Sequence, residues 1–224
     1  IISLIIVFKN FKIKFILPKL ENIKYQLKEG WHIFVSNITG NLYGQGTIVI
    51  LGLVSNNEIV GYYSAAEKLM KAIASLTQPI AQALYPYLVR LKNIKENFKK
   101  IFSPSIIISF IITITTFSLS NFIVKILYGS KMIYSGYILK ILSIVMFFTI
   151  LNVIKQPYIY ALKQDKLNSF MYIFVGLSFL PVCFILSKLY LAVGTAFSLM
   201  YVEILIFSIG LYIIKKGFKN TMSK

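Results

Sequence analysis

The chain has 224 residues, of which 57% are hydrophobic and only 14% are charged, and its mean hydropathy is +0.75. Soluble domains carry about 45–50% apolar and about 25% charged residues, so this composition excludes a disordered chain, a fibre and a typical water-soluble enzyme and indicates an integral membrane protein. The formal net charge of +17 comes from lysines between apolar runs, a pattern typical of cytoplasmic membrane-protein loops rather than of a nucleic-acid-binding face.

The N-terminal part of the sequence divides into a short apolar run and a basic segment. We interpret Ile1–Phe8 as the end of a transmembrane helix that is cut off by the start of the sequence. Residues 9–30 are predicted to form a basic cytoplasmic linker, in which Leu17–Lys28 is either a short amphipathic surface helix or a solvated connection. Residues 31–224 are assigned to one helical lobe with a cytoplasmic tail.

Apolar segments of spanning length fill this lobe, because a transmembrane helix needs about 20 mostly apolar residues. The sequence therefore predicts an all-α integral membrane protein, a bundle of six transmembrane helices. The predicted spans are Trp31–Val54, Gly61–Leu88, Ile101–Leu127, Tyr137–Leu162, Asn168–Ser187 and Leu191–Ile214. Nearly all loop lysines then fall on one side, which the positive-inside rule assigns to the cytoplasm together with the C-terminus.

The second predicted span, Gly61–Leu88, has an alternative interpretation as an amphipathic helix on the membrane surface, because it carries three charged residues. The number of crossings favours a transmembrane span. If Gly61–Leu88 did not cross, the basic loop that begins at Arg90 would lie outside the cytoplasm, and every later loop would change sides as well. Its polar residues recur within about 60° of one line on the helix surface. They are Ser64, Glu67, Lys68, Lys71, Ser75, Gln78 and Gln82.

We expect this polar stripe to line a water-filled cavity, because polar atoms that face lipid lose their hydrogen bonds. The alternative is a buried structural ion pair between Glu67 and Lys71, which are four residues apart in the favourable order. In the first span Asn37, Asn41 and Gln45 also share one face, and their amides contact either sugar hydroxyls or each other.

Three further ionisable residues lie within the predicted spans. Glu203 has no basic residue within four positions, so it should pair across helices or carry a proton. Lys140 and Lys155 lie near opposite ends of the fourth span, where each is expected to extend to its own interface, although both could also line one cavity. Prolines within or near the span ends should kink or break their helices: Pro79, Pro86, Pro157 and Pro181.

The sequence contains no catalytic constellation. It has one histidine and one cysteine, and it lacks a phosphate-cradling loop, a zinc-ligand spacing and a nucleophile elbow. We therefore expect no enzymatic activity, no cofactor and no metal. The predicted cytoplasmic loops are too short to fold as an ATPase domain, so any transport should be driven by an ion gradient or by the gradient of the substrate itself.

Three stretches resemble a known family. The stretch GYYSAAEKLMKAIASLTQPIAQALYPYLVRL (Gly61–Leu91), preceded by NLYGQGTIVILGLVSNNEIV (Asn41–Val60), resembles polysaccharide flippases of the multidrug/oligosaccharidyl-lipid/polysaccharide exporter superfamily, in particular the Wzx-type O-antigen transporters. ILYGSKMIYSGYILKIL (Ile126–Leu142) is similar to the region between that family's ninth and tenth helices. The resemblance extends over almost the whole chain.

The resemblance implies an architecture of twelve helices in two six-helix lobes, with both termini in the cytoplasm. This chain would then be a C-terminal lobe fragment: the end of helix six, the interlobe linker and the complete C-terminal lobe. The family's substrate cavity lies between the lobes, so we do not expect this chain alone to transport.

The resemblance implies a secondary transporter in the bacterial inner membrane. Its substrate would be an undecaprenyl-pyrophosphate-linked oligosaccharide, an O-antigen or capsule repeat unit, moved from the cytoplasmic to the periplasmic leaflet by alternating access. The implied partners are this substrate, the membrane, the missing N-terminal lobe, a polysaccharide polymerase and a chain-length regulator. No nucleic acid is implied.

The same resemblance implies substrate-binding and ion-coupling roles for the residues that match the family's motif region. Lys68 or Lys71 would attract the pyrophosphate, with Lys140 and Arg90 as lesser candidates, and the amides of Gln78 and Gln82 would contact sugar. Glu67 or Glu203 would couple proton or sodium movement to transport.

Three rival functions are alternatives to the flippase. A cation-coupled drug or metabolite exporter of the same superfamily should have an acidic, apolar cavity, whereas lysines outnumber glutamates within the predicted spans. A membrane enzyme that handles lipid-linked sugars should carry a large outer loop, and the predicted outer loops are short. A non-transporting scaffold is the third alternative.

Overall fold

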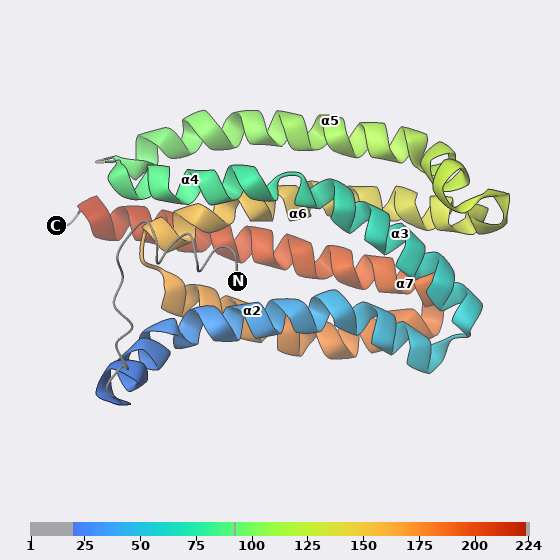
Figure 1. The fold of residues 1–224 in the computed structure, drawn as a ribbon, viewed down its shortest axis with the longest axis horizontal. Coiled ribbons are helices and arrows are strands. Elements are labelled where there is room, and N and C mark those ends of the chain that lie inside the picture. The colour runs from blue at the N-terminus through green and yellow to red at the C-terminus, as the bar shows by residue number, and fades with distance from the viewer. Residues whose placement is uncertain (1–19, 92, 223–224) are drawn as a thin grey trace, which may run out of the picture. The chain divides into compact units, whose positions relative to one another are not determined.

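The computed structural model describes residues 20–91 and 93–222, and within these ranges every regular element is a helix (Figure 1). The chain divides into two units, Ile1–Trp31 and His32–Lys224. The predicted truncated helix Ile1–Phe8 lies outside the described residues. Helix α2 (Leu20–Val54) supplies the described part of the first unit and the first element of the second.

In the first unit, the described residues are helical from Leu20 onward, so the described part of Leu17–Lys28 is a helix and not an irregular linker. Its large apolar side chains are exposed, including Leu20 at 84% and Leu27 at 68%. Exposed leucines on a lysine-bearing helix are what an amphipathic segment at a membrane surface presents.

The predicted span Gly61–Leu88 is wrong as one continuous helix, because the structure divides it into α3 (Asn57–Ser75) and α4 (Gln78–Arg90). Leu76 and Thr77 close the end of α3 with short-range bonds to the carbonyls of Ile73 and Ala74. Pro79 follows within the first turn of α4. Proline has no N–H to donate to the carbonyl four residues earlier, and it is tolerated in a first helical turn, so the break lies where the sequence places Pro79.

Helix α6 (Ile133–Ala161) is the centre of the second unit. It contacts α3, α4, α5 (Ile94–Tyr128) and α7 (Asp165–Met222). A short 3-10 helix, Ser130–Met132, precedes it after Gly129, whose φ of 81° ends α5. With four neighbours, α6 is buried along much of its length, while Ile133, Tyr137 and Ile144 are exposed.

Helix α7 turns sharply at Leu191, where φ is 51° and ψ is −131°. The Ser187 and Thr195 hydroxyls lie 2.8 Å apart across the turn, although eight residues of straight helix would separate them by about 12 Å. The bend lies where the sequence separates the fifth and sixth predicted spans. We call residues 165–190 the first arm of α7 and residues 192–222 its second arm (Figure 1).

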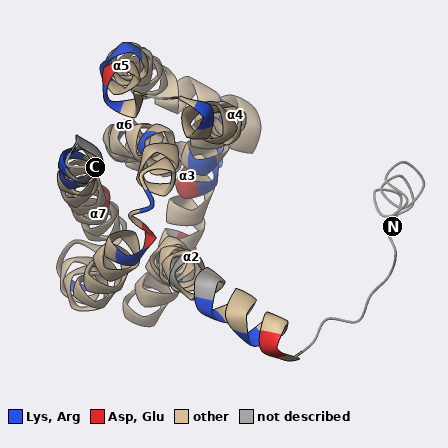
Figure 2. Ribbon diagram, turned by 90° about the vertical axis from the view of Figure 1, so that its left-hand side faces the viewer, with Lys and Arg blue, Asp and Glu red and all other residues tan. Residues whose placement is uncertain are grey.

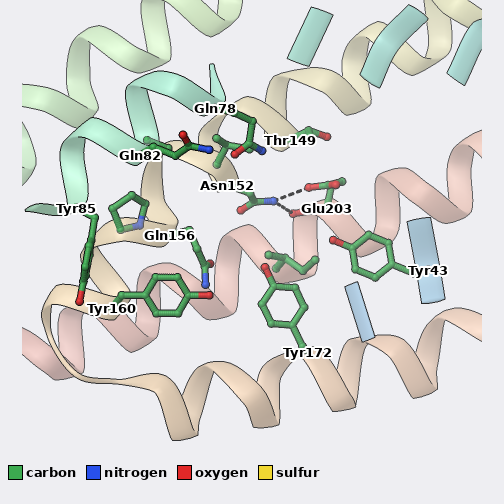
Figure 3. A pocket seen from close by; sticks show the side chains of 14 residues that line it. Tyr43, Gln78, Gln82, Tyr85, Thr149, Asn152, Gln156, Tyr160, Tyr172 and Glu203 are labelled. Atoms are coloured by element: carbon green, nitrogen blue, oxygen red, sulfur yellow. Dashed lines mark hydrogen bonds between the residues drawn. The ribbon is translucent and has the colours of Figure 1, made fainter. Parts of the chain in front are cut away.

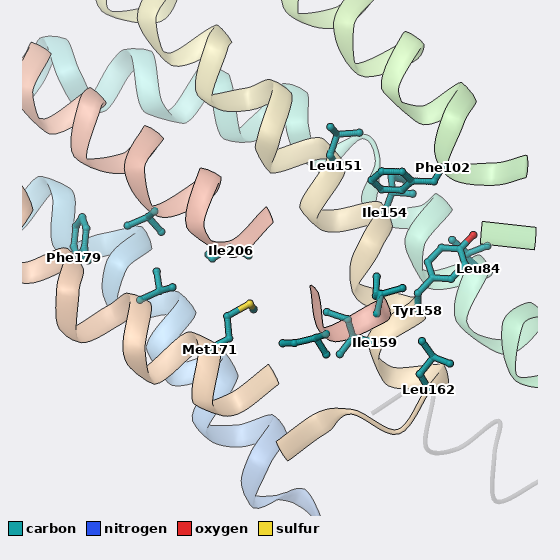
Figure 4. Close-up of a cluster of buried hydrophobic side chains, with 14 of the residues drawn as sticks. Leu84, Phe102, Leu151, Ile154, Tyr158, Ile159, Leu162, Met171, Phe179 and Ile206 are labelled. Carbon is teal, nitrogen blue, oxygen red and sulfur yellow. The ribbon is translucent and has the colours of Figure 1, made fainter. Parts of the chain in front are cut away.

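An apolar cluster joins the second-unit helices near one end of the bundle (Figure 4). Phe102 of α5, Leu151 and Tyr158 of α6 and Met171 of α7 are members of this cluster and are almost fully buried. Because these side chains pack closely against one another, the cluster fixes how the polar side chains of the same helices are placed.

Three helical segments are long and apolar enough to cross a membrane: Ile94–Tyr128, Ser130–Ala161 and Asp165–Lys219. Large apolar side chains also cover much of the outer surface of α5, among them Ile107, Phe110 and Phe122. Such a surface is compatible with a lipid environment and not with water. These observations support a membrane protein.

Basic residues gather at one end of the second unit. The start of α5 and the end of α7 carry Lys95, Lys99, Lys215 and Lys216, and both segments lie at the end that faces the viewer in Figure 2. This is the distribution that the loop lysines predict for a protein with one basic membrane face.

The bend in α7 requires a residue without a side chain at position 194. A Cβ on Gly194 would collide with the carbonyl oxygen of Leu186. We therefore expect Gly194→Ala to lower the stability of the protein by about 1–3 kcal/mol, as overpacking does. Thermal unfolding of the detergent-solubilised protein, followed by size-exclusion chromatography, measures this change.

The matched control is Gly61→Ala, because nothing lies within 4 Å of a Cβ built there. Alanine in place of a helical glycine should leave stability unchanged or raise it by about 0.5–1 kcal/mol. Equal melting temperatures for Gly194→Ala and the unaltered protein would contradict the tight bend.

Candidate functional site

Helix α6 carries a line of polar side chains on one face. Thr149, Asn152, Gln156 and Tyr160 are spaced by three, four and four residues, which places them within about 80° of the helix surface. Helix α4 presents a similar face, where Gln78, Gln82 and Tyr85 recur at intervals of four and three. The apolar cluster of Figure 4 holds α4 and α6 through other faces, so the two polar faces are turned to a common space.

This space is a cavity of about 480 Å³, within the range of about 300–1,000 Å³ that is usual for small-molecule sites. Figure 3 shows its tyrosines and amides converging from several helices. We call it the polar cavity. Its lining residues are Tyr43 of α2; Gln78, Ala81, Gln82 and Tyr85 of α4; Thr149, Asn152, Val153, Gln156, Pro157 and Tyr160 of α6; and Tyr172, Glu203 and Ile206 of α7.

One hydrogen-bond network crosses from α6 to the second arm of α7 at the cavity wall. The Asn152 side-chain N–H donates to the Glu203 carboxylate at 2.7 Å and to the Glu203 carbonyl at 3.0 Å. The Lys155 amine donates to the Asn152 side-chain oxygen at 2.8 Å and to the Ile206 carbonyl. Because the amine engages the amide oxygen, the amide N–H group is directed toward Glu203.

Lys155 is fully buried, so the prediction that its side chain extends to a membrane interface is wrong. Two features explain its position. Helix α6 is enclosed by four helices, and the amine occupies the place that a side chain at position 210 would take, because a Cβ on Gly210 would collide with it. The ring of Phe207 lies 5.7 Å from the amine and adds a cation–π contact.

A second polar group joins α3 to α2. Glu67 is buried, pairs with the Lys71 amine at 3.1 Å and accepts from the Thr47 hydroxyl at 3.0 Å. The Lys71 amine also donates to the Gly44 carbonyl at 2.7 Å. These contacts correspond to the structural interpretation of the pair, in which Glu67 and Lys71 hold two helices together.

The structure brings only part of the predicted site together. Gln78, Gln82 and Glu203 line the polar cavity. Asn41 and Gln45 instead line a second cavity of about 670 Å³ between α2 and the first arm of α7, whose other walls are mostly apolar. The remaining predicted residues line neither cavity: Glu67 and Lys71 pair with each other, Asn37, Lys68 and Arg90 are exposed, and Lys140 is half-buried.

Several cavity residues were missed by the sequence analysis. Asn152 and Gln156 are four residues apart in a strongly apolar span, and with Thr149 they form the same kind of stripe that was recognised in Gly61–Leu88. That spacing alone could have identified this face of the helix as a candidate cavity wall. The tyrosines carried no such signal, because Tyr43, Tyr85, Tyr160 and Tyr172 are common in membrane helices and converge only through the tertiary fold.

The side chains of the polar cavity are suited to binding a ligand through hydrogen bonds and aromatic contacts. Amides, tyrosines, a hydroxyl and one carboxylate supply hydrogen-bond donors, acceptors and aromatic faces. Within residues 20–91 and 93–222, no three His, Cys, Asp or Glu side chains lie close enough together to hold a metal ion.

Comparison with known proteins indicates a family. Residues 1–92 match the family model described as polysaccharide biosynthesis protein. The chain is 30% identical to a protein of Escherichia coli (strain K12) named "Putative O-antigen transporter" over 97% of this chain and 54% of that protein. A Shigella dysenteriae protein of the same name is 28% identical over 92% of this chain and 53% of its own length.

The chain therefore spans about half the length of the curated relatives that it matches. No solved structure matches it. The family resemblance that the sequence indicated is confirmed by these relatives, and their names agree with a transporter rather than an enzyme.

The buried network predicts a large effect of removing the Lys155 amine. Lys155→Ala would leave the Asn152 oxygen and the Ile206 carbonyl unpaired and the Glu203 carboxylate without its nearby cation. We expect a loss of about 3–5 kcal/mol, the usual cost of breaking a buried charged network. Thermal unfolding of the purified protein measures the loss.

Lys188→Ala is the control, because Lys188 is exposed, and an exposed lysine should change stability by no more than about 0.5 kcal/mol. If the Lys155 and Lys188 variants unfolded at the same temperature, the buried network would have no structural role.

Proposed function

Because the chain is an O-antigen-transporter-type protein by its sequence relationships, we propose that it forms the cavity-bearing lobe of a secondary transporter for lipid-linked oligosaccharide. The substrate is an undecaprenyl-pyrophosphate-linked repeat unit of O-antigen or capsule, and transport runs from the cytoplasmic to the periplasmic leaflet. The polar cavity is the observation that carries this proposal.

The physical problem of such transport explains why a polar cavity matters. A glycan brings many hydroxyl groups, each of which loses hydrogen bonds when it enters hydrocarbon. The polar cavity offers replacement partners inside a bundle whose outer surface is apolar, notably the amides of Gln78, Gln82, Asn152 and Gln156. An amide both donates and accepts, so it matches a hydroxyl in either orientation.

The pyrophosphate needs cations, and these lie outside the polar cavity. Lys71 is engaged by Glu67 and by the Gly44 carbonyl, whereas Lys68, one residue beyond Glu67, is exposed. We therefore assign the attraction of pyrophosphate to Lys68 first, with exposed Arg90 and half-buried Lys140 in supporting roles. Glu203, which lines the cavity, is better placed than Glu67 to exchange a coupling ion.

The proposed topology follows the basic residues. The six predicted spans form one lobe, the lysine-rich end faces the cytoplasm with the C-terminus, and the membrane is the bacterial inner membrane. A second lobe of six helices completes the alternating-access transporter. A polymerase and a chain-length regulator would act on the delivered repeat units.

A cation-coupled exporter of drugs or metabolites is the second candidate, and one observation favours it: the polar cavity combines a carboxylate, Glu203, with four tyrosines. Aromatic rings and a carboxylate suit a cationic compound. The four amides and the names of the relatives favour the glycan. Unchanged drug susceptibility on expression of the full-length protein would exclude the exporter.

The first test removes two cavity amides from the full-length protein. Gln78→Leu with Gln82→Leu should reduce O-antigen display about tenfold in a strain that lacks its own transporter, because two hydrogen bonds of about 0.5–1.5 kcal/mol each are lost. Display is measured on lipopolysaccharide gels. Gln26→Leu, an exposed glutamine outside the cavity, is the control, and full display by the double variant would refute the role of the cavity.

The second test concerns the pyrophosphate. Lys68→Gln should slow movement of a lipid-linked oligosaccharide in proteoliposomes about tenfold, since hydrogen bonds to charged groups contribute about 1.5–3 kcal/mol. Lys188→Gln is the matched control, because Lys188 is exposed on a different segment. Equal rates for the two variants would assign the phosphate contact elsewhere.

A further inference from the structure

The geometry points to an uncharged, hydroxyl-rich glycan segment as the occupant of the polar cavity, and to the exclusion of acidic sugars from it. This inference rests on the proposed function, since it names the kind of glycan that the transporter would accept. It follows from the charges at the cavity wall, from the side chains around them and from the position of the nearest cations.

The only ionisable carboxylate or ammonium group among the described lining residues is the Glu203 carboxylate, and no lysine or arginine lines the cavity there. This is unexpected in a chain with 24 basic and 7 acidic residues. A sugar that carried a carboxylate would therefore meet a like charge and no lining cation. Such an arrangement discriminates by repulsion as well as by attraction.

Lys155 does not supply the missing cation. Its amine is buried and is held by the Asn152 side-chain oxygen and by the Ile206 carbonyl. The Asn152 side chain stands between this amine and the cavity, whose wall Asn152 itself forms. A ligand in the cavity consequently contacts the Asn152 amide and the Glu203 carboxylate rather than the buried amine.

The remaining wall suits neutral sugars. Tyr43, Tyr85, Tyr160 and Tyr172 stand around the cavity in Figure 3, so several aromatic faces are available to the C–H faces of pyranose rings. Amides from α4 and α6 supply donors and acceptors, and a carboxylate accepts hydrogen bonds from hydroxyl groups. A hydroxyl-rich ring satisfies all three kinds of group without bringing a charge.

The exposed cations lie on other surfaces. Lys68 on α3 and Arg90 at the end of α4 are exposed and line neither cavity. The structure thus separates the attraction of phosphate from the recognition of sugar. Glycan selection by the polar cavity is therefore independent of the negative charge that every lipid-linked substrate carries on its pyrophosphate.

Binding of two matched trisaccharides to the full-length protein in nanodiscs tests this inference. One is a neutral hexose trisaccharide, and the other is the same molecule with a single C6 hydroxymethyl group oxidised to a carboxylate. Isothermal titration calorimetry should give an affinity about tenfold weaker for the acidic molecule, because like charges in a desolvated site repel. Equal or tighter binding of the acidic trisaccharide would overturn the inference.

Two variants identify the group responsible. Glu203→Gln keeps the shape and hydrogen bonding of the side chain but removes its charge, so it should bring the two affinities to within about threefold of each other. Glu58→Gln removes an exposed carboxylate outside the cavity and should leave the tenfold difference intact. A difference that persists in the Glu203 variant, with melting temperature unchanged, would assign the discrimination to another group and refute our account.

A transport assay distinguishes failure of this inference from failure of the proposed function. In proteoliposomes, the full-length protein should move a lipid-linked neutral trisaccharide faster than its oxidised counterpart. Equal movement of both would overturn the charge selection and leave the transport function standing. If neither were moved while the soluble neutral trisaccharide still bound preferentially, the transport function would fail and the assignment of the cavity's ligand would stand.

Discussion

The architecture depends on a lysine amine that is sealed inside an apolar helical bundle. A buried ammonium group is tolerated only with several close acceptors, and Lys155 has the Asn152 side-chain oxygen, the Ile206 carbonyl and the face of Phe207. These contacts fix the direction of α6 against the second arm of α7. They also fix which way the Asn152 amide points, and hence where Glu203 meets the polar cavity.

Two polar groups with different tasks lie within one membrane-type fold. Glu67 and Lys71 join α3 to α2 through Thr47 and Gly44, so their charges are used within the scaffold. The polar cavity is built from residues whose hydrogen-bonding groups face the cavity. Position relative to the neighbouring helices, and not polarity alone, decides which of these two tasks a polar residue in a span performs.

Much of the helical content followed from the sequence, because long apolar runs have few alternatives in a membrane protein. Of the polar stripe predicted along Gly61–Leu88, Gln78 and Gln82 line the polar cavity, whereas Glu67 and Lys71 pair with each other. The continuity of the stripe was wrong, since Pro79 divides the helix and directs Glu67 and Gln82 to different neighbours. The burial of Lys155 was not predictable from α6 alone, because it depends on Gly210 of another helix.

The interruption between α3 and α4 has a mechanical consequence. Helix α3 is joined to α2 by the Glu67–Lys71 pair and its hydrogen bonds, whereas α4 carries Gln78 and Gln82. Only Leu76 and Thr77 connect them along the backbone, and Pro79 cannot extend the hydrogen-bond ladder across the gap. The glutamine-bearing α4 is thus joined to α3 by two residues alone, and its direction is set by its own packing against α6 and not by a continuation of the α3 hydrogen-bond ladder.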